Sequence, residues 1–93
     1  MKDEIKKFAH QFKLTPRETE IFFLLASRVT TFKEIAQSLG SSPSTVKNQF
    51  KSIFLKTKTN TKSELLGVFI GQIFLTRKQI DQHIKIYLPD QSV

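Results

Sequence analysis

Apolar residues recur along the chain at helical spacing, and short polar segments divide them into blocks. Residues 2–12 carry Ile5, Phe8, Ala9 and Phe12 at spacings of three and four. This pattern predicts a short helix with one apolar side and lysines around it, because residues three and four apart share one face of a helix.

A second helix is expected from Pro16 to about Arg28. Thr15 stands at the N-cap position, Pro16 at a position where the helix needs no backbone N–H, and Glu18 can complete a capping box. Its wide apolar face comprises Ile21, Phe22, Leu24, Leu25 and Val29. Such a face must be covered, so we expect this helix to back the helices that follow it.

The stretch 31–58 predicts two helices, 32–39 and about 43–57, joined by a tight turn. Gly40 suits the left-handed conformation that often closes a helix. Ser42 and the proline after it are typical of a helix start. Two helices joined by a short glycine-containing turn form a helix-turn-helix, whose second helix enters the major groove in DNA-binding proteins.

The helix 43–57 is expected to have one buried and one basic side. At 100° per residue, the buried side comprises Val46, Phe50, Ile53 and Thr57. The opposite side carries Ser44, Lys47, Asn48 and Lys51. Asparagine can pair with adenine, and lysine can donate to guanine or to phosphate. We therefore expect these four residues to read DNA bases.

Two further helices are expected in the C-terminal third. Capping boxes at Thr61 and Thr76 mark their starts, and Pro89 ends the second, which spans 76–88. The first is apolar over more of its circumference than one core contact needs. It also contains a ridge of two small residues, four apart, that permits close helix packing: Gly67 and Gly71.

Together these elements predict an all-α fold, a small helical bundle that contains a helix-turn-helix. We expect a single domain, 1–93, with a four-helix core at 14–75 and short helical additions at both ends. Within 93 residues we expect no separate sensor module of ordinary size. Its net charge of +7 favours a polyanionic partner, and double-stranded DNA is the partner that the basic helix fits best.

Several other classes of protein are disfavoured by the composition. Without cysteine, disulfides and thiolate metal sites are excluded, and the two histidines lack metal-ligand spacing, so no metal or cofactor is expected. No nucleophile–base pair suggests an enzyme. The longest apolar run, 65–75, is too short to span a bilayer, and the start lacks a signal-peptide pattern. We expect a cytoplasmic, nucleoid-associated protein without membrane attachment.

Five blocks, in order along the chain, resemble the LuxR-type (GerE/FixJ-like) helix-turn-helix domain. They contain Leu14-Thr15-Pro16-Arg17-Glu18-x-Glu20-Ile21, Lys33-Glu34-Ile35-Ala36-x-x-Leu39-Gly40, Ser42-x-x-Thr45-Val46-Lys47-Asn48, then Ile53 with Lys56, and Thr61-Lys62-Ser63-Glu64-Leu65. Each block alone is weak, but all of them at nearly the family's spacing form a specific pattern. The resemblance covers about residues 14–74.

The resemblance implies a four-helix domain that binds DNA, usually as a dimer on an inverted repeat, and regulates transcription. It assigns base contact to the exposed side of the helix 43–57 and dimerisation to the helix that starts at Thr61. The residues expected to contact the DNA backbone are Lys33, Ser42, Thr45, Lys56, Lys58 and Lys62. The residues expected to form a homodimer are Leu65, Leu66, Phe69, Ile70 and Ile73.

The chain departs from the family pattern at several positions. The turn glycine that usually precedes the helix-turn-helix is missing, and Ser27-Arg28-Val29 stands there. Gln49 replaces a usual histidine or tyrosine, and Leu55 stands where a charged residue is common. Thr57 and Thr59 replace apolar residues, which thins the core at the end of the second helix of the motif.

Other interpretations stay open at this point. The lysines at 56, 58 and 62 can contact phosphate or lie in a solvated loop, and the two glycines can serve packing within the chain. The alternative function is a protein-interaction module on a helix-turn-helix scaffold, which binds RNA polymerase or another regulator. Electrostatic attachment to membranes is disfavoured because the phenylalanines are needed in the core.

Overall fold

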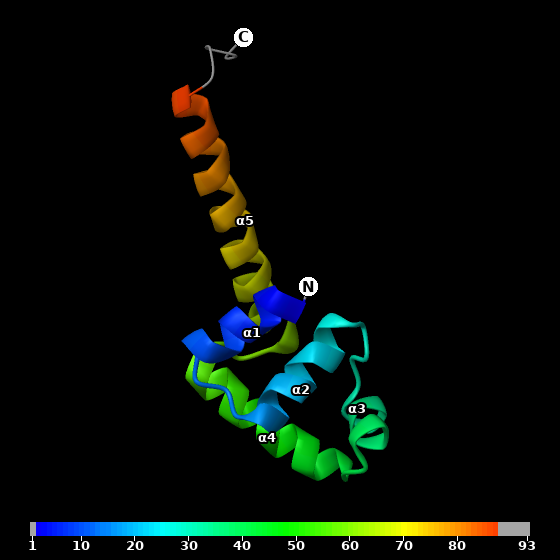
Figure 1. Cartoon of the computed structure of the whole chain (residues 1–93). Coiled ribbons are helices and arrows are strands. Elements are labelled where there is room, and N and C mark those ends of the chain that lie inside the picture. Colours follow the sequence, from blue (N-terminus) through cyan, green and yellow to red (C-terminus); the bar gives the residue numbers. More distant parts are fainter. Residues whose placement is uncertain (1, 88–93) are drawn as a thin grey trace.

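The structure is a computed structural model that describes the backbone of residues 2–87 and the side chains of residues 2–74. Five helices make up this part of the chain (Figure 1): α1 Lys2–Gln11, α2 Pro16–Ala26, α3 Phe32–Leu39, α4 Pro43–Thr57 and α5 Lys62–Tyr87. The expected all-α bundle with a helix-turn-helix is therefore confirmed. No helix among these residues is long and apolar enough to cross a membrane.

Hydroxyl side chains cap four of the helices, as the sequence predicts. Thr15 and Glu18 form the full capping box of α2: the Glu18 N–H donates to Thr15 Oγ1 (3.1 Å), and the Thr15 N–H donates to the Glu18 carboxylate (2.8 Å). Thr31, Ser42 and Thr61 each accept a backbone N–H at the starts of α3, α4 and α5. These bonds satisfy donors that a helix leaves unpaired at its first turn.

A residue in the left-handed conformation follows each of the helices α1 to α4. Gly40 has φ +66° after α3, where a residue without Cβ meets no penalty. Lys13, Arg28 and Lys58 adopt the same conformation, with φ of 56°, 71° and 56°. Arg28 therefore stands in the turn where the family pattern usually has glycine, and α2 ends at Ala26, before the expected limit. Each of these basic residues costs about 1 kcal/mol relative to a relaxed backbone.

The core joins all five helices and contains three stacked or edge-packed phenylalanines. The ring centroids of Phe8 and Phe22 lie 4.8 Å apart, and both rings meet Phe69 edge-on at 5.3 and 5.1 Å. These rings come from α1, α2 and α5, so the N-terminal helix is part of the core rather than an appendage. Aromatic pairs in such geometry add about 0.5–1.5 kcal/mol each beyond their burial.

The long helix α5 corrects the expectation of two separate C-terminal helices. It runs without interruption from Lys62 to Tyr87, so the helix start expected at Thr76 is wrong. The backbone can continue because no proline falls between these limits. Figure 1 shows the C-terminal half of α5 extending away from the body formed by α1–α4. Pro89 lies outside the described residues.

The two glycines of α5 do not serve packing within the described part of the chain. A Cβ atom placed on Gly67 or Gly71 would meet nothing within 4 Å. The ridge of small residues therefore faces open space, and the interpretation that these glycines pack against another helix of this chain is not supported.

Candidate nucleic-acid interface

The turn between α3 and α4 holds the two helices of the motif close together. The Gly40 N–H donates to the carbonyl of Ala36, and Ser41 N–H donates to the same oxygen (2.9 Å). Ala36 is buried, as are Ile35 on α3 and Val46 on α4. A small residue at position 36 allows the close approach, because a larger side chain would have to occupy space that the packed core lacks.

The basic face of α4 lies open. The four residues expected to read bases are all exposed: Ser44, Lys47, Asn48 and Lys51. The opposite side of the helix is buried, as expected, and comprises Val46, Phe50, Ile53 and Thr57. Because the buried side fixes the rotation of α4 about its axis, the polar side has to point away from the body. In Figure 1, α4 lies along the margin of the body, with α2 and α3 on one side of it.

A group of hydroxyls lies at the N-terminus of α4. Ser42 Oγ accepts the backbone N–H of Thr45 (3.2 Å) and lies 2.9 Å from Thr45 Oγ1 and 3.2 Å from Ser44 Oγ. All three residues are exposed. Ser42 and Thr45 were expected to contact the DNA backbone, and hydroxyls at the positive end of a helix are suited to phosphate.

Lys33 and Lys58 are also exposed, Lys33 on α3 and Lys58 at the C-cap of α4. Their positions at the two ends of the motif are compatible with contacts to phosphates on either side of a groove. Both assignments stay predictions.

Lys56 is placed differently from the expectation. Its ammonium donates to Glu18 Oε1 at 2.6 Å, and the hydroxyl of Ser52 donates to the other oxygen of the same carboxylate at 2.6 Å. Glu18 is only 5% exposed. Lys56 therefore ties α4 to α2 instead of extending freely toward phosphate, because a buried carboxylate needs a charged partner.

The charge of Glu18 is maintained by these contacts. Burial favours the neutral acid, but hydrogen bonds from Lys56, Ser52 and the Thr15 backbone outweigh it and lower the pKa of Glu18 below its ordinary value. The carboxylate is therefore ionised at neutral pH and serves two purposes, since it also completes the capping box of α2.

Lys62 is the second lysine that the chain itself engages. Its ammonium lies 4.3 Å from the centroid of the Phe32 ring and donates to the backbone carbonyl of Thr30. The side chain is half-buried and links the start of α5 to the loop before α3. A cation over an aromatic ring is stabilised there, so release toward DNA would cost this contact.

The expected dimerisation residues fall into two groups. Leu65 and Phe69 are buried in the chain's own core, so their assignment to a dimer surface is wrong; α1 and α2 cover that side of α5. Leu66 and Ile73 are half-buried at the edge of this covered side, and Ile70 is 61% exposed. Phe74, 63% exposed on the same side, was missed although its spacing of four from Ile70 already indicated it.

Leu55 is the other residue that sequence reasoning left without a role. It is 82% exposed. At 100° per residue it points in the same direction as Ser44 and Asn48, one turn beyond Lys51. The sequence already indicated an exposed position, since this leucine stands where a charged residue is common. The structure adds how far the side chain faces outward, because the opposite side of α4 is buried.

The threonines at the end of α4 are satisfied despite their burial. Thr57 Oγ1 lies 2.9 Å from the carbonyl of Ile53, to which it donates, and 2.8 Å from Thr59 Oγ1. Two hydroxyls that bond each other and the backbone replace apolar contacts without leaving an unpaired polar atom. The core is thus closed at the point where the family pattern appeared thinned.

Comparison with known proteins agrees with this geometry. The family model "Bacterial regulatory proteins, luxR family" (GerE) matches residues 13–69, which is more than half of the chain. Comparison with curated proteins and with solved structures gave no match. Domains of this family are DNA-binding helix-turn-helix domains with a regulatory function. The chain belongs to the luxR family of bacterial regulatory proteins.

Proposed function

We propose that this protein regulates transcription by inserting α4 into the major groove and reading bases with Ser44, Lys47, Asn48 and Lys51. The observation that carries the proposal is the division of α4 into a fully buried apolar side and an open polar side. An exposed helix that carries lysines and an asparagine but no acidic residue matches the hydrogen-bonding groups of the groove.

Phosphate contacts supply affinity in this proposal. The hydroxyls of Ser42 and Thr45, with Lys33 and Lys58, surround the reading side and are exposed. Lys56 and Lys62 contribute less, because each already has a partner within the chain. Each neutralised phosphate should contribute a slope of about −0.9 to the dependence of log affinity on log salt concentration.

Selection from random DNA, followed by fluorescence anisotropy, tests the reading side. Lys47→Ala combined with Asn48→Ala should reduce the preference for the selected site over random DNA by about 100-fold, because each good base contact contributes about 1–3 kcal/mol. Lys7→Ala combined with Gln11→Ala is the matched control, since it removes one charge and one amide from exposed positions on α1. Undiminished preference in the first variant would refute the proposed reading side.

Self-association through α5 is the second part of the proposal. Leu66, Ile70, Ile73 and Phe74 form an apolar strip on one side of α5, beside the open glycine ridge. Such a strip gains stability when a second copy covers it. A homodimer would place two copies of α4 on two half-sites, so the selected DNA should be palindromic.

Sedimentation of the full chain tests the dimer. Ile70→Asp should shift the protein toward monomer by at least about tenfold in dissociation constant, because it places a charge in the apolar strip. Ser63→Asp, an exposed position on the same helix, is the control and should leave the dimer intact. A wild-type protein that stays monomeric and selects a site without symmetry would contradict this part alone.

A further inference from the structure

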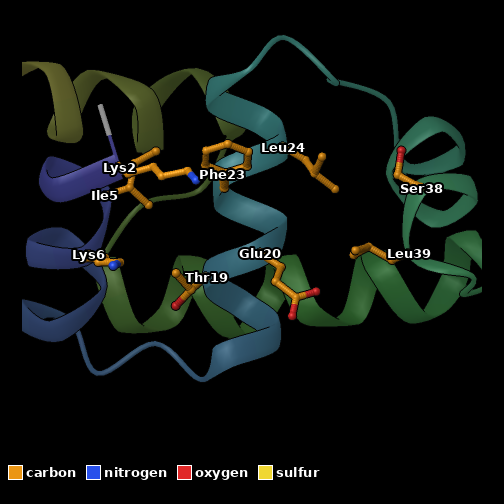
Figure 2. A pocket seen from close by; sticks show the side chains of 9 residues that line it. All are labelled: Lys2, Ile5, Lys6, Thr19, Glu20, Phe23, Leu24, Ser38 and Leu39. Carbon is orange, nitrogen blue, oxygen red and sulfur yellow. The ribbon is translucent and has the colours of Figure 1, made fainter.

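An apolar groove crosses α2 on the side of the body that the DNA-binding proposal does not use. Its volume is about 420 Å³, and its walls come from α1, α2 and α3. Figure 2 shows Lys2 and Lys6 on one side, Phe23 and Leu24 in the middle, and Leu39 on the far side. Phe23 is 37% exposed there, a large apolar side chain that the described part of the chain leaves partly uncovered.

The groove and the reading side of α4 are separate surfaces, because the residues that line the groove belong to α1, α2 and α3. Glu18 extends from the inner side of α2 to Lys56 on α4. Phe23 and Leu24 occupy the other side of α2, and Figure 2 places α4 behind α2 in the view onto the groove. Since none of the lining residues comes from α4, a molecule in the groove would leave the reading side free.

Charge at the rim identifies the kind of molecule that fits. Lys2 and Lys6 are exposed and four residues apart on α1, about 6 Å along its axis, and in Figure 2 Lys2 extends toward Phe23. The acidic residue of the groove, Glu20, already has a partner in Arg17 at 3.2 Å. The rim therefore offers two ammonium groups beside an apolar floor.

We infer that this groove docks an acidic amphipathic helix of another protein. Apolar side chains at every third and fourth position would cover Phe23 and Leu24, and carboxylates on one edge would meet Lys2 and Lys6. A DNA backbone would gain nothing from the apolar floor. Because α1 builds one wall and lies outside the family match, the groove is a property of this chain rather than of the matched region.

Titration of the isotope-labelled full chain by NMR tests this inference directly. The probe is a synthetic 14-residue peptide with leucine on one face of a helix and glutamate on the other, compared with a scrambled peptide of the same composition. The amide signals of Phe23, Leu24 and Leu39 should move with the first peptide and stay in place with the second. They should move equally when DNA is already bound, because the two surfaces do not overlap.

Two neighbouring lysines provide the matched variants. Lys6 lines the groove, whereas Lys7 is exposed on α1 outside it. Lys6→Glu should weaken peptide binding roughly 3- to 10-fold, and Lys7→Glu less than about twofold, although both change the net charge equally. Leu24→Ser should weaken binding by about tenfold through the apolar floor.

Several outcomes would overturn the inference while leaving the DNA-binding proposal intact. Signals that move only on α4 would mean that the peptide binds the basic reading side as a simple polyanion. Groove signals that move when the protein is concentrated without peptide would identify a second copy as the occupant. Equal binding by Lys6→Glu and Lys7→Glu, or no response at millimolar peptide, would also contradict it.

Discussion

The helices α4 and α5 begin in the same way and present opposite kinds of surface. Each starts with a hydroxyl cap and buries one apolar side in the common core. Beyond that side α4 is polar and basic over its first two turns, whereas α5 exposes Ile70 and Phe74. A polar surface suits the hydrated groove of DNA, and an apolar one suits a protein. Burial of one side thus orients each helix, and the exposed side is the one on which we propose that each helix meets its partner.

The largest expected effect comes from changing the angle at which α4 leaves α3. Ala36→Leu introduces a larger side chain between the two helices and should destabilise the fold by about 3 kcal/mol. Urea denaturation followed by circular dichroism measures the loss. Gln37→Leu, at an exposed position of α3, is the control and should change stability by less than about 0.5 kcal/mol. Similar midpoints for the two variants would mean that the close approach at Ala36 does not position α4.

The tie between α2 and α4 should make stability depend on pH. The pKa of Glu18 is lowered in the folded protein relative to its value of 4.5 in the unfolded chain. The ionised carboxylate therefore stabilises the fold fully at pH values above 4.5, and this contribution is lost as the pH falls through the folded pKa. Glu18→Gln should cost about 2 kcal/mol at neutral pH, since Lys56 and Ser52 lose a charged acceptor.

Acid titration of unfolding distinguishes this site from ordinary surface carboxylates. The wild type should lose more stability below about pH 4.5 than Glu18→Gln does, because the variant lacks the group that is protonated there. Glu20→Gln, which removes only the exposed pair with Arg17, should behave like the wild type within about 0.5 kcal/mol. If the Glu18 variant and the wild type lost stability in parallel on acidification, the tie would not contribute as described.

Leu55 interrupts the contrast between the two helices, since it is an apolar residue on the polar side of α4. Leu55→Lys should make that side uniformly basic and steepen the salt dependence of DNA binding by about 0.9, with little change in stability. Gln11→Lys adds the same charge on α1 and should leave the slope unchanged. An unchanged slope for Leu55→Lys would place the C-terminal end of α4 beyond reach of the phosphates.

The smallest expected effect concerns Lys58 at the C-cap of α4, where two substitutions distinguish a change in stability from a change in DNA binding. Lys58 has φ +56°, so Lys58→Gly should raise stability by about 0.5 kcal/mol and reduce the salt slope by about 1. Lys58→Ala should reduce the slope equally without the gain in stability, because alanine keeps the strained backbone. Equal stability of the two variants would show that the left-handed residue carries no cost here.

Local signals in the sequence predicted most of the fold. The limits of α3 and α4, four hydroxyl caps and the buried side of α4 follow from turn chemistry and helical spacing, which depend on residues close in the chain. The partners of Lys56 and Lys62 could not be predicted this way. A long flexible side chain can reach many groups, and the choice depends on which helices the fold brings beside it.

The assignment of Leu65 and Phe69 failed for a related reason. Spacing showed that α5 is apolar on more than one side, but not which side the body covers. The ring of Phe8, some sixty positions earlier in the chain, decides this by packing against Phe69. Burial of α5 therefore depends on the docking of α1 and α2, which no local pattern encodes.

The same ring has a practical consequence for anyone who trims this protein. The family match begins at residue 13, yet Phe8 packs against both Phe22 and Phe69. A fragment cut at the family boundary would uncover the parts of these two rings that Phe8 covers, and we expect it to be less stable and more prone to aggregate. The stretch that matches the family model is therefore shorter than the stretch that builds the hydrophobic core.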